Sequence, residues 1–224
     1  MSINVNHVTD TETPTTGNLN VAGIMTLPNA SGNGIKVNNA SPAFGWQDLI
    51  GAITAKTSGV TAAPFNTFRN NILAYQMDNS SRAFYIVYHM PHDYVPGTDV
   101  FWHVHWAHNS ASVTTGSVTW QYEATYAKGF NQAPFPASVV GTVTQAASTV
   151  QYQHMVAEGQ MSVAGGSGTQ LNSTNFEVDG LILLVATLSA NTMSAATDPF
   201  IFTADIHYQS TGISTKNKAP NFYT

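Results

Sequence analysis

The sequence predicts an all-β protein, a jelly-roll-like β-sandwich with an extended N-terminal arm. From residue 83 onward, short stretches rich in β-branched and aromatic residues alternate with connections that contain Gly and Pro, a pattern typical of strands joined by turns. No stretch carries apolar residues at the spacing of an amphipathic helix. The chain has 224 residues, 43% of them hydrophobic, which is enough for one sizeable core, so we expect a single sandwich domain.

Residues 1–45 form the predicted arm. They are rich in Thr, Asn, Gly and Pro, with short apolar runs at Val21–Ile24 and at residues 35–37. Such a segment cannot bury a core of its own. Two interpretations stay open: an arm that docks strand by strand on another chain, or a leader without fixed structure.

Residues 46–224 form the predicted sandwich, which ends in a short C-terminal tail. Trp46–Ile53 fits either one helical turn or a strand. In the strand over residues 99–108, alternation places Val100, Trp102, Val104 and Trp106 on one face and His103 and His105 on the other. In the last strand, one side is predicted to hold Phe200, Phe202, Ala204, Ile206 and Tyr208. The predicted strands are Ala83–His89, Asp99–His108, Gly116–Ala127, Gly180–Leu188 and Phe200–Tyr208.

Two connecting regions have their own patterns. The region Gly129–Ala157 contains Pro134 and Pro136 and then a Val/Thr-rich stretch, which we interpret as an edge strand or a strand between subunits. Gly165–Gly168 predicts a flexible loop. No Lys and no helix start follow it, so it is not a phosphate-binding loop.

The charge of the chain favours assembly over a freely soluble monomer. Only 8% of residues are charged, against about 25% in typical domains. A surface of uncharged polar residues is easily desolvated and suits protein contacts; the alternative is a secreted or simply weakly charged protein. The net charge is −5 and the seven Lys and Arg are scattered, so nucleic-acid binding is not expected.

Several other classes are excluded or disfavoured. The chain has no Cys, which excludes disulfides and thiolate metal sites. The first residues lack the basic and apolar regions of a signal peptide, and no apolar run approaches the roughly 20 residues of a membrane helix. We therefore expect a soluble protein made in a cytoplasm, with no membrane partner.

Histidines are the one concentration of chemically active residues. His103 and His105 lie on one strand face, where two imidazoles can share a metal ion. Alternatively, they are core or interface residues bonded to the backbone, or they meet copies of themselves on a threefold axis. The histidines that gather within twenty residues are His89, His92, His103, His105 and His108.

The spacing around these residues resembles the first metal-binding motif of the cupin family. Gly97, His103, His105 and Gly116 occupy the motif's positions, but Asn109 stands where the family has Glu. The second motif, with its further His, is missing. The resemblance implies that His103 and His105 would be metal ligands, and it leaves the other ligands unassigned.

Other catalytic and binding patterns are weak. The acidic residues are dispersed, and no Ser lies in a Gly-x-Ser-x-Gly motif. Glu177 and Asp179 fit a turn or a calcium site. Trp102, Trp106 and Trp120 fit a core or a sugar-binding face. We therefore expect no enzyme and no cofactor, and we assign no catalytic, cofactor-binding or metal-binding residue.

Three segments resemble structural proteins of tailed bacteriophages: Ile86–Trp106, His207–Tyr223 and the stretch GNLNVAGIMTLPNASGNGIKV that begins at Gly17. The resemblance implies a capsid cement (decoration) protein on the virion surface. Its expected partners are further copies of itself, as a homotrimer or dimer, and the major capsid protein. Ile3–Val37 and Lys216–Thr224 would be the clamping segments, and deletion of residues 1–30 is expected to abolish capsid binding. The alternatives are a tail fibre or tailspike that binds a host glycan, and a cupin-like metalloenzyme.

Overall fold

The fold is given by a computed structural model that describes residues 45–55, 59, 62–78 and 81–223. The predicted arm, apart from Gly45, lies outside the described residues. Residues Ser173–Asn175 form a short 3₁₀ helix, η1. The strands are β1 (Gly45–Gly51), β2 (Thr54–Ala55), β3 (Phe65–Arg69), β4 (Ile72–Gln76), β5 (Ala83–His89), β6 (Phe101–Ala107), β7 (Ser117–Ala127), β8 (Val139–Ala146), β9 (Met155–Gln160), β10 (Ser162–Val163), β11 (Leu171–Asn172), β12 (Leu181–Asn191) and β13 (Phe200–Ser210).

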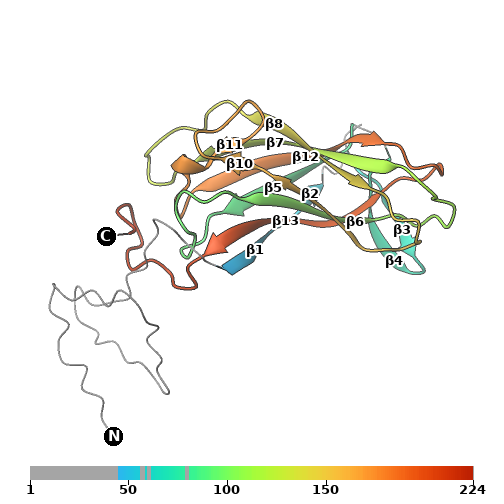
Figure 1. The fold of residues 1–224 in the computed structure, drawn as a ribbon, viewed down its shortest axis with the longest axis horizontal. Coiled ribbons are helices and arrows are strands. Elements are labelled where there is room, and N and C mark those ends of the chain that lie inside the picture. The colour runs from blue at the N-terminus through green and yellow to red at the C-terminus, as the bar shows by residue number, and fades with distance from the viewer. Residues whose placement is uncertain (1–44, 56–58, 60–61, 79–80, 224) are drawn as a thin grey trace, which may run out of the picture. The chain divides into compact units, whose positions relative to one another are not determined.

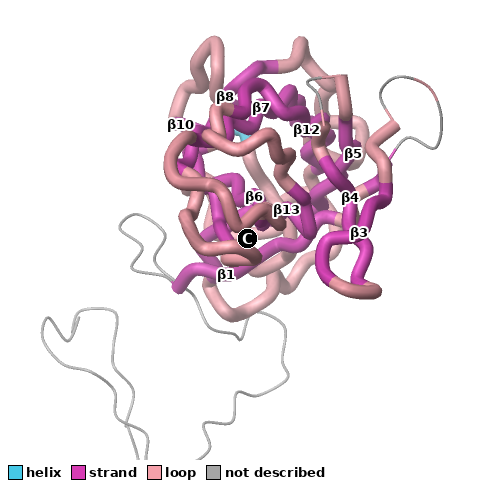
Figure 2. Tube along the Cα trace, turned by 90° about the vertical axis from the view of Figure 1, so that its right-hand side faces the viewer, coloured by secondary structure: helices cyan, strands magenta, loops and turns pink. Residues whose placement is uncertain are grey.

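Apart from β10 and β11, which form a separate parallel pair, the described strands form two stacked antiparallel sheets, which confirms the predicted all-β sandwich class (Figures 1 and 2). The first, here called sheet A, has the order β3-β4-β13-β6-β9, and β1 also pairs with β13. The second, sheet B, has the order β2-β5-β12-β7-β8. Strand order departs from chain order, so many neighbouring strands come from distant parts of the chain, whereas β3–β4 and β7–β8 are consecutive. Among the described residues, no helix has the length and apolar character that crossing a membrane requires.

The core lies between the two sheets and contains the tryptophans that the alternation predicted to share a face. Trp102 and Trp106 of β6 and Trp120 of β7 are fully buried. Each buried side chain stabilises the fold by about 25 cal/mol per Å² of apolar surface removed from water. The core interpretation of these three residues is therefore confirmed.

The last predicted strand is confirmed, but one of its side chains points the other way. The register between β13 and β6 shifts between Ile201 and Thr203, which marks a β-bulge. A bulge adds a residue to one strand and reverses the alternation around it. Ile201 is therefore buried, while Phe202 is exposed and packs against Phe68 with ring centroids 5.0 Å apart. The expectation that Phe202 shares the core face was wrong.

Two open interpretations are resolved by strand pairing. The segment from Trp46 is strand β1, which pairs with β13 from Gly45↔Ser210 to Gly51↔Ala204, so the helical alternative was wrong. The Val/Thr-rich stretch is β8, at the edge of sheet B. Its edge position is confirmed, and its role between subunits stays a prediction.

The C-terminal tail packs against the sandwich of its own chain. The backbone N–H of Thr215 donates to the His92 carbonyl at 2.9 Å. Phe222 is buried, and its ring meets that of His92 edge-on at 5.8 Å. The tail is thus held to the domain by an apolar anchor near its end.

Candidate functional site

The histidine-bearing face of β6 lies on the outer side of sheet A. Strand register brings acidic residues to it from both sides, because His103 pairs with Asp205 of β13 and with Glu158 of β9. Next to Asp205, His207 pairs with Asp48 of β1. We call His103, His105, His154, His207, Asp48, Asp205 and Glu158 the histidine–carboxylate cluster.

His103 lies at the centre of this cluster and contacts two carboxylates. Its Nε2 is 2.5 Å from Oε2 of Glu158, and its Nδ1 is 3.4 Å from Oδ2 of Asp205. The side chains of His103 and Asp205 are both buried. A buried imidazole with a carboxylate at each nitrogen has a fixed ring orientation.

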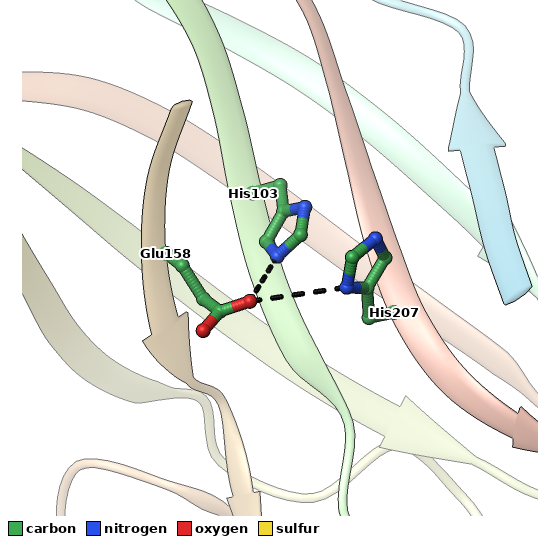
Figure 3. Close-up of side chains that lie close together, drawn as sticks. All are labelled: His103, Glu158 and His207. Carbon is green, nitrogen blue, oxygen red and sulfur yellow. Dashed lines mark hydrogen bonds and ion pairs between the residues drawn. The ribbon is translucent and has the colours of Figure 1, made fainter. Parts of the chain in front are cut away.

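His207 lies beside His103, with ring centroids 3.7 Å apart. Its Nδ1 is 3.8 Å from the same Oε2 atom of Glu158, and its Nε2 pairs with Asp48. Figure 3 shows His103, His207 and Glu158, which come from β6, β13 and β9, converging on one point. One carboxylate oxygen therefore faces a nitrogen of each of two imidazoles.

His105 extends the cluster along β6. Its Nε2 is 2.7 Å from Oδ1 of Asp205, so the Asp205 carboxylate contacts both His103 and His105. The Nδ1 of His105 lies 2.9 Å from Nε2 of His154, and the two rings stack with centroids 5.1 Å apart.

The environment shifts two pKa values in the cluster. Burial alone would lower the pKa of His103, but its hydrogen bonds to Asp205 and Glu158 outweigh this, and the pKa is raised. Burial alone would raise the pKa of Asp205, but hydrogen bonding to His103 and the charge of His105 outweigh it, and the pKa is lowered. Both shifts favour charged pairs.

Imidazole nitrogens and carboxylate oxygens are the ligands that zinc and related transition metals prefer. Among the residues that the structure describes, three sets of ligand atoms lie within 4.8 Å of one another in this face: His103–Glu158–His207, His103–His105–Asp205 and Asp48–Asp205–His207. The arrangement can hold a divalent metal ion or store protons.

The sequence singled out His103 and His105 and placed them on one face, which is confirmed. Their side chains bond to carboxylates, so the alternative of backbone-bonded histidines was wrong for this pair. The view of the acidic residues as dispersed was also wrong, because Asp48, Glu158 and Asp205 meet here. The cupin alignment offered Asn109 at the carboxylate position, but that amide donates to the Thr67 carbonyl at 3.4 Å.

The remaining histidines of the sequence cluster have other partners. His89 and His92 both contact Oδ1 of Asp179 at 3.1 Å. His108 is buried, with its Nε2 2.8 Å from the Ser148 carbonyl. Of the two carboxylates considered for a calcium site, Asp179 thus contacts the first two of these histidines, whereas Glu177 pairs with Lys128 at 3.3 Å. The two carboxylates therefore have different partners.

A second surface of interest is the outer face of sheet B. Tyr85 and Val87 of β5, Leu183 of β12 and Val140 of β8 are exposed there. Among the outward positions of β5, β7, β8 and β12, which the structure describes in full, Glu123 is the one Asp, Glu, Lys or Arg. It accepts a hydrogen bond from Ser138 at 2.6 Å. We call this surface the sheet B face.

Solved structures resemble this chain, whereas family models and curated proteins do not. No protein-family model matches the chain, and no curated protein matches it. One similar solved structure holds the N-terminal CBM22-1–GH10 modules of Clostridium thermocellum endo-1,4-β-D-xylanase 10B with xylohexaose (15% identity, TM-score 0.32). The match covers 72% of this chain but only 26% of that one.

Two further similar structures are carbohydrate-binding modules. The xylan-binding module CBM15 shares 10% identity at a TM-score of 0.31, over 78% of this chain and 95% of that chain. TmCBM61 in complex with β-1,4-galactotriose shares 9% at a TM-score of 0.27, over 73% and 88%. These TM-scores are too low to establish a common fold, so the fold described above rests on the strand pairings of this chain.

Proposed function

We propose that this chain is a non-enzymatic structural protein of a bacteriophage virion, a capsid cement protein that binds the major capsid protein lattice and stabilises it. The observation that carries the proposal is the sheet B face, which presents exposed apolar side chains in a nearly uncharged setting. A protein that binds only the assembled lattice stabilises it by mass action.

The sheet B face has the composition of a protein interface. Val87 is 53% exposed and Leu183 is 38% exposed, so both have apolar surface left to bury, worth about 25 cal/mol per Å². The surrounding Thr and Gln side chains of β7 and β8 lose less solvation on contact than charged residues would. Depletion of charge around an apolar centre is the pattern of interface cores.

The virion setting is supported by the bacteriophage resemblance of Ile86–Trp106 and His207–Tyr223. These segments correspond to part of β5, most of β6, part of β13 and the tail, and so contribute to both sheets. The predicted dimer or homotrimer would then present several copies of the sheet B face to adjacent capsid subunits.

The proposal is tested by co-sedimentation of the purified chain with shells of the major capsid protein of the same virus. Leu183→Lys on the sheet B face is expected to weaken binding at least tenfold, because it buries an unpaired charge. Ile72→Lys is the matched control, since Ile72 is an exposed apolar residue of β4 in sheet A. Failure of the wild-type chain to sediment with the shells, or equal loss in both variants, would contradict the proposal.

A second candidate function is glycan binding, favoured by one exposed aromatic residue. Trp46 is 50% exposed on sheet A, edge-on to Phe101 at 5.4 Å and next to the ring of His207 at 6.5 Å. An exposed Trp beside hydrogen-bonding groups can stack on a sugar ring. A glycan array that shows binding by the wild type and none by Trp46→Ala would support it, and an array without signal for the wild type would rule it out.

A further inference from the structure

We propose that His103, His207 and Glu158 form a binding site for a divalent transition-metal ion, with zinc as the ion that the donor set fits best. The site is independent of the proposed capsid function. It combines two imidazole nitrogens with one carboxylate oxygen, each from a different strand of sheet A (Figure 3).

The three ligand atoms all lie within 4.8 Å of one another, and two of their separations can be compared with those that a metal needs. Zinc binds nitrogen and oxygen at about 2.0–2.1 Å in a tetrahedral arrangement, so its ligand atoms are roughly 3.3 Å apart. In the structure, Oε2 of Glu158 is 2.5 Å from His103 Nε2 and 3.8 Å from His207 Nδ1. The first separation must open and the second must close, each by less than about 1 Å. A rotation of the Glu158 side chain, which is 55% exposed, can accomplish both.

The far nitrogen of each imidazole is already held by a separate carboxylate. His103 Nδ1 faces Asp205 at 3.4 Å, and His207 Nε2 is paired with Asp48. Metal-binding histidines in proteins commonly donate their other ring N–H to a carboxylate, which fixes the tautomer and strengthens the ligand. This doubled arrangement points to a metal independently of the three ligand atoms.

The three carboxylates of the cluster also need positive charge to compensate their own negative charge. Among the ion pairs of the described residues, the carboxylates of Asp48, Glu158 and Asp205 pair with imidazoles and with no Lys or Arg. The described Lys and Arg pairs lie elsewhere, at Arg82 and Lys128. A divalent ion supplies the missing charge without protonating every imidazole.

Access of an ion from solvent distinguishes this triad from the two other sets of ligand atoms. Both alternatives depend on Asp205 as a ligand, and its side chain is only 4% exposed. The Glu158 side chain, in contrast, lies at the surface on β9, the end strand of sheet A. An ion can therefore reach Glu158 from solvent, while the buried Asp205 orients the imidazole of His103.

Such a site would have one open position. Three protein ligands leave the fourth tetrahedral position for water or for a group from a bound partner, whereas purely structural zinc sites use four protein ligands. The ion would also tie the edge strand β9 to its neighbour β6 and, beyond β6, to β13.

The test is calorimetric titration of the chelator-treated full chain with ZnCl₂. We expect one zinc per chain, with at least tenfold weaker binding in Glu158→Gln and in His207→Gln. The matched control is His89→Gln, because His89 is also an exposed histidine next to a carboxylate, Asp179, and its variant should bind zinc like the wild type. Circular dichroism and urea unfolding establish that each variant is folded.

Three results would overturn the proposal. The wild type could bind no stoichiometric zinc, or His89→Gln could weaken binding as much as His207→Gln does, which would indicate unspecific histidine binding. The third is a strong loss in His105→Gln with none in Glu158→Gln, which would place the ion between His105 and Asp205 instead.

Discussion

Replacement of Asp205 tests whether the buried carboxylate holds the histidine–carboxylate cluster together. Its oxygens are 3.4 Å from Nδ1 of His103 and 2.7 Å from Nε2 of His105. Asp205→Ala removes both acceptors and leaves the buried imidazole of His103 without its partner on that side. We expect the variant to be destabilised.

The size of the expected loss in the free energy of unfolding follows from how deeply Asp205 and its histidine partners are buried. Breaking a fully buried ion pair costs about 3–5 kcal/mol. Here the His105 side chain is 23% exposed, so water can replace part of what it loses. We therefore expect a loss of about 2–3 kcal/mol for Asp205→Ala. Asp205→Asn keeps one acceptor oxygen and should cost about 1 kcal/mol.

The assay is urea unfolding at neutral pH in buffer with a chelator, so that no metal contributes. The midpoint should fall while the slope of the transition stays constant. Asp48→Ala is the matched control, because Asp48 pairs with His207 through an exposed side chain and such pairs contribute at most about 1 kcal/mol. If Asp205→Ala is as stable as the wild type or as Asp48→Ala, the buried pairs contribute nothing net and the reasoning fails.

Three further predictions concern packing and pH. A Cβ at Gly141 would lie 2.3 Å from the Tyr122 ring, so Gly141→Ala should cost about 1–3 kcal/mol in urea unfolding, whereas Gly168→Ala, with nothing within 4 Å, should cost less than about 0.5 kcal/mol. Phe222→Ala should lower stability by about 3 kcal/mol and speed proteolytic release of the tail; an unchanged cleavage rate would contradict the anchoring role. Burial, followed by the nearby Asp93 carboxylate, raises the pKa of Tyr208 from 10.0 to about 12. The Tyr208 hydroxyl therefore loses its proton at lower pH in the unfolded chain than in the folded one. The free energy of unfolding should decline as the pH rises from 10 toward about 12. The decline should be smaller in Tyr208→Phe, which has no hydroxyl to titrate.

The local pattern of apolar and polar residues along the sequence was sufficient to predict most of the fold. The stretch AFYIVYH became β5 with the predicted bounds, and the alternation in the next strand placed Trp102 and Trp106 in the core. These results depend on the two-residue period of strand side chains, which any single strand displays. The bulge that turned Phe202 outward depends on the pairing of β13 with β6, and no pattern within one strand encodes it.

The sequence by itself determined that this protein is a β-sandwich with a weakly charged surface, and that His103 and His105 share one outward face of a strand. Only the tertiary structure decided what these histidines meet. His103 and Glu158 are separated by 55 residues, and His207 lies on β13, on the other side of β6 from β9. They come together because antiparallel register aligns particular residues of non-consecutive strands. Register is set by the burial of whole sheet faces and the lengths of the connections, so no local pattern reveals which outward side chains will meet.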